Sequence, residues 1–398
     1  MRRTRTVAVV AGAAIAMACS GPRTGAPAAP RGQWEHLVGW YHLGDGGEAL
    51  LTWGADTDLR LVRPSAPYLS EPFRSRSDGT FAWQRSGSGE AETRAVRFTA
   101  TASGGVAGFT WVDPDGDSGL VSRRETQPYA LRELEYRSRE VPLSGTLLVP
   151  RAEGPVPAAV MIHGSGDSDR DNLWYLAIAD HLARHGVAVL LPDKRGCGRS
   201  GGDWRTAGME DLAADALAGV EAVGHHPGIA PAAIGLLGCS QGGSIAPLAA
   251  SGTPGLSFVV GLSGGVASFN EILLHESRQT LRQEGLPGAL ADALAPLAAA
   301  LAKRRRPIWW RKNGEFTPLP HWRRLELPTL VVYGAEDERD NVPVAASVAR
   351  LQEARLPDLT VVVYPDSGHG LFEPGTRTLR RDFLGLLTSW ILEKASAS

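Results

Sequence analysis

This 398-residue sequence has few cysteines, no large excess of charge of either sign and no long hydrophobic run. Only three cysteines occur, Cys19, Cys197 and Cys239, so no disulfide framework supports the fold. The 41 basic and 43 acidic residues leave a formal net charge of −2, so the chain offers no bulk attraction for nucleic acid or acidic membranes. No apolar run approaches the ~20 residues needed to cross a bilayer, which predicts that the protein is not polytopic.

The composition is that of a folded globular protein. Hydrophobic residues make up 43% and charged residues 21% of the sequence, far from the pattern of disordered chains. The length predicts two or three domains. With this charge balance, a small molecule or a neutral polymer is the expected partner.

Residues 1–19 have the pattern of a secretory signal peptide, because Arg2, Arg3 and Arg5 precede an apolar stretch that ends at Cys19. Residues 16–19 resemble a bacterial lipobox, in which the cysteine becomes the lipidated first residue. We expect an exported cell-envelope lipoprotein attached to the membrane through Cys19. The alternative is ordinary cleavage near Ala18, which would give a secreted or periplasmic protein. Residues 20–32 are expected to form a linker.

Residues 33–128 are predicted to form a small all-β domain of the barrel or sandwich kind. Short apolar-polar runs alternate there with Gly, Asp and Pro turns, which is typical of half-buried antiparallel strands. The same region holds five tryptophans, at Trp34, Trp40, Trp53, Trp83 and Trp111. They are expected to be core aromatics, with a ligand groove as the alternative.

Residues 129–396 are predicted to form an α/β domain. A strand pair around 134–149, joined at Pro142–Gly145, is followed by near-continuous apolar runs that alternate with helical segments. Such runs are buried on both faces, as in a parallel sheet. The sequence therefore predicts an open, mostly parallel sheet with helices on both faces and ligands bound outside the carboxyl ends of its strands.

The pattern G-x-S-x-G occurs three times, around Ser200, Ser240 and Ser263. A nucleophilic serine needs a sharp strand-to-helix turn, with glycines that make room for its strained backbone. Only Ser240 lies between a predicted strand and a predicted helix without glycines that block the helix start. Ser240 is therefore the candidate nucleophile.

A serine nucleophile needs a base, and the base needs a carboxylate to orient it. Asp337 and His369 each follow a predicted late strand, so the chain order is Ser240, Asp337, His369. Glu336 and Asp340 are the alternatives for the acid.

These residues and their order resemble the α/β-hydrolase superfamily over about residues 131–393. The resemblance implies a Ser-His-Asp triad of Ser240, His369 and Asp337. It also implies an oxyanion hole made by the backbone N–H groups of Gln241 and of Ser165, with Gly164 as the alternative to Ser165. A helical insertion over about 266–325 is similar to the cap of this superfamily.

The resemblance implies a serine esterase that cleaves small-molecule carboxylic esters through an acyl-enzyme, with no cofactor and no metal. A serine peptidase, an amidase or an acyltransferase of the same fold is the alternative. A non-catalytic cell-surface binding lipoprotein is an alternative of another class. Whether Cys197 and Cys239 pair, what the oligomeric state is and which ester is the natural substrate are open at this point.

Overall fold

The computed structural model describes residues 34–54, 59–64, 69–84 and 93–396. The predicted signal peptide at 1–19, the lipidation site Cys19 and the linker at 20–32 lie outside the described residues. Within these ranges, no helix is both long and apolar enough to cross a membrane.

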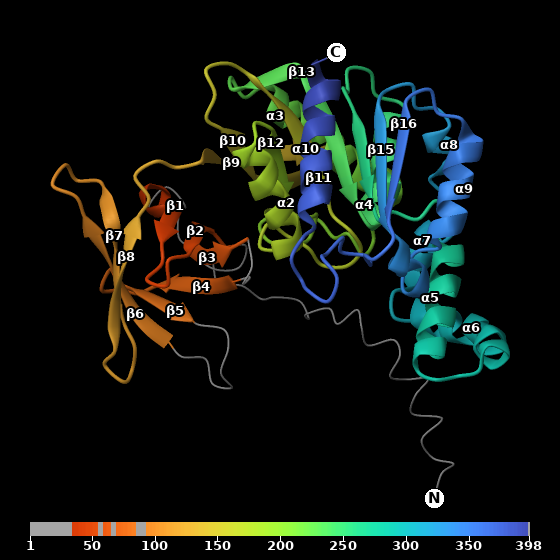
Figure 1. The fold of residues 1–398 in the computed structure, drawn as a ribbon, viewed down its shortest axis with the longest axis horizontal. Helices are drawn as coiled ribbons and strands as arrows, with labels where there is room; N and C mark the ends of the chain where they lie inside the picture. The colour runs from red at the N-terminus through yellow and green to blue at the C-terminus, as the bar shows by residue number, and fades with distance from the viewer. Residues whose placement is uncertain (1–33, 55–58, 65–68, 85–92, 397–398) are drawn as a thin grey trace, which may run out of the picture.

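The chain first forms a closed antiparallel β-barrel (Figure 1, left). Its strands are β1 (Gly39–His42), β2 (Glu48–Trp53), β3 (Leu59–Arg63), β4 (Leu69–Ser75), β5 (Phe81–Gln84), β6 (Thr93–Ala100), β7 (Val106–Val112) and β8 (Ser118–Arg123). Each strand pairs with the next along the chain, and β1 closes the barrel by pairing with β8. The short 3-10 helix η2 (Glu35–Leu37) precedes β1. This confirms the prediction of a small all-β region before the α/β sheet.

Aromatic side chains fill the interior of the barrel. Five rings pack edge-to-face or tilted against one another: Tyr41, Phe73, Phe81, Phe98 and Phe109. Of the five tryptophans noted in the sequence, Trp40, Trp53 and Trp83 are buried, and Trp34 and Trp111 pack at the margin of the same core. The tryptophans are therefore core residues, as expected, and the barrel is filled by side chains.

The second unit is built on an eight-stranded sheet in the order β16-β15-β14-β13-β11-β12-β10-β9. Its strands are β9 (Tyr129–Ser138), β10 (Val141–Pro150), β11 (Val156–Ile162), β12 (Ala188–Pro192), β13 (Ile229–Cys239), β14 (Val259–Leu262), β15 (Thr329–Gly334) and β16 (Leu359–Tyr364). The six strands from β16 to β12 in this order run parallel to one another, whereas β10 pairs antiparallel with both β12 and β9. The predicted mostly parallel sheet is confirmed.

The predicted turn between the first two strands of this sheet was placed wrongly. The sequence suggests a turn at Pro142–Gly145, but β9 ends at Ser138 and β10 begins at Val141. The turn is made at Arg139, which adopts a left-handed φ of 51°. Gly145 serves packing instead, because a Cβ there would lie 2.9 Å from Leu190 Cδ1 of the neighbouring strand β12.

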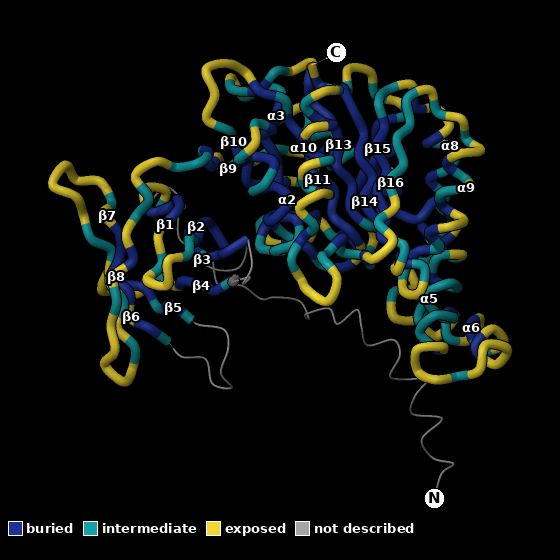
Figure 2. Tube along the Cα trace, in the orientation of Figure 1, coloured by how far each residue is buried: buried dark blue, intermediate teal, exposed yellow. Residues whose placement is uncertain are grey.

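Helices cover both faces of the sheet, and the inner strands are buried between them, whereas the edge strands β9 and β16 are only partly buried (Figure 2). One face packs against α2 (Leu173–Arg184) and α10 (Arg381–Ser396). The other face packs against α3 (Met209–Gly224), α4 (Gln241–Ala250) and α9 (Val344–Ala354). Because successive side chains of a strand point to opposite faces, the near-continuous apolar runs supply both layers of the core.

A helical insertion separates β14 from β15. It consists of α5 (Phe269–Gln283), α6 (Gly288–Lys303), α7 (Pro307–Asn313) and α8 (Leu319–Trp322). Helices α5 and α6 pack on each other through Leu281, Ala291 and Ala295 and extend beyond the sheet (Figure 1). Because Ser268 accepts a hydrogen bond from the Glu271 N–H and Glu271 bonds back to it, a capping box fixes the start of α5.

The barrel packs against helix α2 of the second unit. Arg184 lies over the Trp40 ring at 4.2 Å, and the guanidinium of Arg60 lies 3.0 Å from the carboxylate of Asp171, just before the helix. The barrel and this face of the sheet share one apolar cluster of buried side chains. The two units are therefore joined by packing as well as by the chain.

Candidate active site

Ser240 sits at a strained turn between β13 and α4. Its φ of 54° and ψ of −120° are unfavourable for a residue with a side chain. Two glycines allow this turn, since a Cβ on Gly238 would collide with the carbonyl of Gly242, and a Cβ on Gly242 with that of Ile162. The turn leaves Ser240 partly exposed at the N-terminus of α4, where the helix dipole favours negative charge.

The other two serines of the G-x-S-x-G pattern have structural contacts. The Ser200 hydroxyl donates to the Asp193 carbonyl at 2.7 Å and accepts from the Ser144 N–H at 3.0 Å. The hydroxyl of Ser263 is buried and donates to the His369 carbonyl at 2.8 Å. Ser263 follows β14 but does not begin a helix, and Ser200 lies in a loop. Of the three serines, only Ser240 lies at a strand-to-helix turn.

Asp337 and His369, which are 32 residues apart in the chain, form a hydrogen bond. His369 Nδ1 donates to Asp337 Oδ2 at 2.7 Å. The second oxygen of this fully buried carboxylate accepts from the Asn341 side chain at 3.2 Å. Since Nδ1 is taken by the carboxylate, the other ring nitrogen is left to exchange a proton.

The alternative acids do not reach the histidine in this way. Glu336 is held through its N–H, which donates to the Ser367 carbonyl, and Asp340 accepts from Gln283 on α5. Both flank Asp337 in the 3-10 helix η3 (Ala335–Arg339) or at its end. Asp337 is therefore the acid that the structure pairs with His369.

Ser240 and His369 lie at the same edge of the sheet. Strands β13, β14 and β15 are parallel neighbours, so the segments after them meet there. The N–H of Ser240 donates to the Leu262 carbonyl at the end of β14, and the next residue, Ser263, holds the His369 carbonyl. Within the described residues, no hydrogen bond joins the Ser240 hydroxyl to the His369 ring, a contact that often tightens only when substrate binds.

Charges around His369 favour its protonated form. Burial opposes the charge, but the hydrogen bond and charge of Asp337, with smaller contributions from Glu276 and Asp340, raise the pKa of His369. The Trp174 ring packs against the imidazole of His369, with their centroids 6.0 Å apart, and Trp174 Nε1 donates to the Gly370 carbonyl. The histidine is thus held on two sides and is suited to accept a proton.

Glu276 is a site residue that sequence reasoning missed. It lies on helix α5 of the insertion, close enough to Asp337 and His369 for their charges to act on it, and its neighbour His275 bonds the Glu338 carbonyl in η3. Burial raises the pKa of Glu276 to about 7, while the charge of His369 lowers it and that of Asp337 raises it. The residues around Glu276 in the sequence do not indicate this position, because it depends on how helix α5 packs against η3.

The loop after β11 contains Ser165 and Gly164, the two alternatives for one of the two expected oxyanion-hole donors; the other, Gln241, begins α4. The Gly164 N–H donates to the Tyr175 hydroxyl at 2.8 Å, so this N–H is engaged. Ser165 is exposed, whereas Gln241 is buried at the first position of α4. Because the Gly164 N–H is engaged by Tyr175, the Ser165 N–H remains the candidate of the two alternatives.

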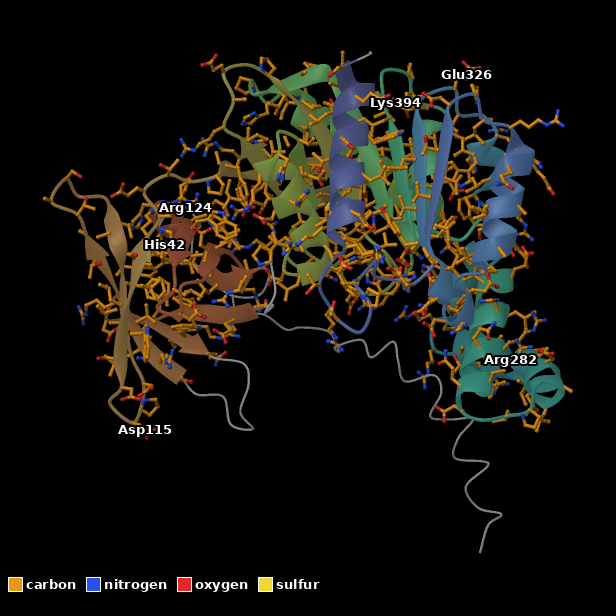
Figure 3. All side chains as sticks on the ribbon, viewed as in Figure 1. His42, Asp115, Arg124, Arg282, Glu326 and Lys394 are labelled. Atoms are coloured by element: carbon orange, nitrogen blue, oxygen red, sulfur yellow. The ribbon has the colours of Figure 1, made fainter. Side chains whose placement is uncertain are left out.

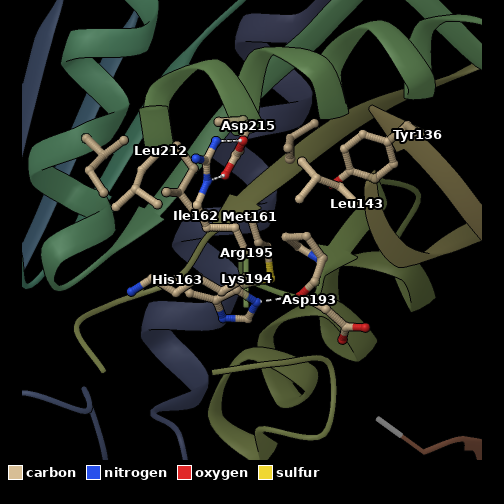
Figure 4. A pocket seen from close by; sticks show the side chains of 14 residues that line it. Tyr136, Leu143, Met161, Ile162, His163, Asp193, Lys194, Arg195, Leu212 and Asp215 are labelled. Atoms are coloured by element: carbon tan, nitrogen blue, oxygen red, sulfur yellow. Dashed lines mark hydrogen bonds and ion pairs between the residues drawn. The ribbon is translucent and has the colours of Figure 1, made fainter. Parts of the chain in front are cut away.

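A buried polar network supports this loop. Burial lowers the pKa of His163 to about 4, so the ring is neutral, and it bonds the Pro192 carbonyl at 2.6 Å. The guanidinium of Arg170 makes two hydrogen bonds to Asp193, at 2.8 and 2.6 Å, and the Arg170 N–H makes a third at 3.1 Å. Figure 4 shows His163 and Asp193 beside a small cavity on the α3 side of the sheet, where Arg195 pairs with Asp215. The network fixes the ends of β11 and β12 next to each other.

Cys197 and Cys239 are free thiols. Both are buried, and burial raises the pKa of Cys197 to about 11 and that of Cys239 further. Buried thiols with raised pKa values are unreactive at neutral pH. Among the described residues, no group of three or more His, Cys, Asp or Glu side chains is placed to hold a metal ion.

Residues 159–379 match the model of the alpha/beta hydrolase family. Two curated relatives are a dipeptidyl aminopeptidase BIII of Pseudoxanthomonas mexicana and the esterase EstD of Thermotoga maritima. The first is 26% identical over 56% of this chain and 32% of its own length. The second is 23% identical over 62% of this chain and 65% of its own length. The chain thus spans about one third and just under two thirds of these relatives.

Among solved structures, an esterase of Pyrococcus furiosus is similar over 68% of this chain and 96% of its own, with a TM-score of 0.51 and 20% identity. At this identity the likeness concerns the fold.

Proposed function

The chain belongs to the alpha/beta hydrolase family, and from this premise we propose that it is a serine hydrolase that cleaves carboxylic esters. Ser240 is the nucleophile, His369 the general base and Asp337 the residue that orients it. The observation that carries the proposal is the 2.7 Å hydrogen bond between Asp337 and His369 at the sheet edge where the strained turn presents Ser240.

In the proposed reaction, the Ser240 hydroxyl attacks the ester carbonyl carbon while His369 Nε2 takes its proton. The N–H groups of Gln241 and Ser165 hold the negative charge that develops on the carbonyl oxygen. The imidazolium, stabilised by Asp337, then protonates the leaving alcohol, and an acyl-enzyme remains. Water, deprotonated by His369, attacks this acyl group, and collapse of the second intermediate releases the acid and the serine.

Amide cleavage is a second candidate, because one curated relative is a dipeptidyl aminopeptidase. The same residues perform both reactions, and amides demand more of the proton that His369 delivers to the leaving nitrogen. An ester-over-amide preference is favoured by the esterase match, which spans a larger share of the relative's length.

The test is hydrolysis of p-nitrophenyl esters from acetate to palmitate, with the matching p-nitroanilides as amides. We expect ester turnover that falls at least 10³-fold in Ser240→Ala. Ser389→Ala, an exposed serine on α10, is the matched control and should retain full activity. Ester turnover that survives Ser240→Ala would refute the proposal, and anilide turnover above ester turnover would favour the peptidase.

We further propose that the protein is exported and attached to the membrane through a lipid on Cys19. The support is the sequence pattern of residues 1–19 alone. Mass spectrometry of the protein isolated from cell envelopes decides between lipidated Cys19 at the new N-terminus and plain cleavage near Ala18.

A further inference from the structure

A buried lysine lies beneath the proposed oxyanion hole. Lys194 follows strand β12 and is only 7% exposed. Its Nζ donates to the carbonyls of Gly164 at 2.8 Å and Gly166 at 3.2 Å, and to Gln241 Oε1 at 3.3 Å. An ammonium has three donors and no acceptor, so these three oxygens match its charged form. A neutral amine would turn its lone pair towards one of them.

The three acceptors belong to the two segments that would bind the oxyanion. Gly164 and Gly166 flank Ser165, and Gln241 directly follows Ser240. A carbonyl held by Lys194 fixes the peptide plane to which it belongs, and with it the direction of the next N–H. The Gly164 carbonyl shares its peptide plane with the Ser165 N–H. One ammonium thereby sets the orientation of that N–H and ties the loop to the start of α4.

The charge of Lys194 has no carboxylate within ion-pair distance among the described residues. Asp193, its neighbour in the chain, is engaged by Arg170. The Trp204 ring lies 4.8 Å from Nζ. Burial lowers the pKa of Lys194 to about 8, Arg306 and Arg205 lower it as well, and Cys197 and Asp167 raise it. His163, whose pKa is lowered in part by the charge of Lys194, is a further titratable group near the ammonium.

We propose that Lys194 is a positioning residue of the oxyanion hole, whose ammonium holds the Gly164–Gly166 loop and the Gln241 side chain so that the N–H groups of Ser165 and Gln241 converge. Lys194 does not touch the substrate. The inference rests on the proposed function for its kinetic consequence and on the geometry alone for its effect on the loop.

The kinetic test compares Lys194→Met with the wild type and with Lys394→Met. Lys394 lies on α10 near the C-terminus (Figure 3) and forms an ion pair with Asp358, which precedes β16. It serves as the matched control. Misplacing one oxyanion donor costs roughly 10²-fold in kcat. We expect such a loss for Lys194→Met with KM changed less than about threefold, since ground-state binding does not use the oxyanion contacts. Equal losses in both variants, or a loss confined to KM, would overturn the proposal.

The pH profile distinguishes positioning from a merely structural contribution. Because the ammonium is the form that fits, wild-type kcat should fall as pH rises above about 8, with spontaneous hydrolysis subtracted. This basic limb should be absent from Lys194→Met, whose side chain does not titrate. A basic limb of the same midpoint in both proteins would show that Lys194 is not its source.

Hydrogen exchange tests the loop without any turnover. Amides of the peptide that contains Ser165 should exchange at least tenfold faster in Lys194→Met than in the wild type, while peptides of the barrel stay unchanged. If Lys194→Met does not fold, Lys194→Gln takes its place. Unaltered exchange would refute the positioning, whereas a wild type that is inactive on esters but shows the exchange difference would refute only the proposed function.

Discussion

Glu276→Gln is predicted to stabilise the protein at alkaline pH. The substitution keeps the shape of the side chain and removes its ability to ionise. Burial beside the Asp337–His369 pair raises the pKa of Glu276 from its ordinary value of 4.5 to about 7. Because the folded-state pKa is above that of the unfolded chain, the protonated form is favoured on folding. The stability this gives is full below pH 4.5 and is lost as pH rises through 7.

The magnitude follows from the same two values. Each pH unit between the folded and unfolded pKa costs ~1.4 kcal/mol, so the wild type loses roughly 1 kcal/mol by pH 5 and roughly 3 kcal/mol by pH 8. Glu276 is partly exposed, and solvent screening makes these figures upper bounds. The glutamine variant does not suffer this loss. Its advantage over the wild type should therefore grow by about 2 kcal/mol between pH 5 and pH 8.

Thermal unfolding by calorimetry measures this difference. At ~2–4 °C per kcal/mol, Tm of the variant relative to the wild type should rise by about 4–8 °C more at pH 8 than at pH 5. Glu353→Gln, an exposed position on α9, is the control and should show no such growth. A Tm difference for Glu276→Gln that is the same at both pH values would refute the burial argument.

Two further substitutions test the site geometry. Asp337→Asn should lower kcat by about 10³–10⁴-fold, because the amide favours the wrong tautomer of His369. It should also move the acid limb of kcat/KM to lower pH, and an unmoved limb would contradict the charge argument. Gly242→Ala should destabilise the protein by more than about 3 kcal/mol in urea unfolding, because its Cβ would collide with the Ile162 carbonyl. Gly252→Ala, with nothing within 4 Å of a new Cβ, should change little.

The parts of the fold that were predictable from sequence are those set by local pattern. Strands β15 and β16 are continuous apolar runs in the sequence, and the helix predicted directly after Ser240 is α4. The turn before β10 was misplaced because Pro142 and Gly145 are turn formers in isolation. Both residues lie in β10, which pairs with β12, and Gly145 leaves the room that this pairing requires. A contact between segments so far apart in the chain cannot be recognised from the local sequence.

The same division applies to the site. Ser240, Asp337 and His369 are recognisable because each follows a strand within a few residues, so chain position almost fixes spatial position. Lys194 also follows a strand, but the contacts of Lys194 and of Glu276 cannot be inferred from chain position. The role of Lys194 depends on carbonyls about 30 residues away, and that of Glu276 on the packing of a cap helix against η3. Contacts of this range leave no periodicity in the sequence.

The docking of the barrel on α2 has a consequence for how this protein can vary over evolution. Arg60 contacts Asp171 just before α2, and Trp40 contacts Arg184 at the end of the same helix. The first turn of α2 carries Trp174, whose ring packs against His369. Selection for the proposed reaction therefore extends to the barrel, whose described residues include none of the three proposed catalytic residues. Among related sequences, Arg60 and Trp40 should therefore vary less than residues on the outward face of the barrel, such as Leu120, which is 63% exposed.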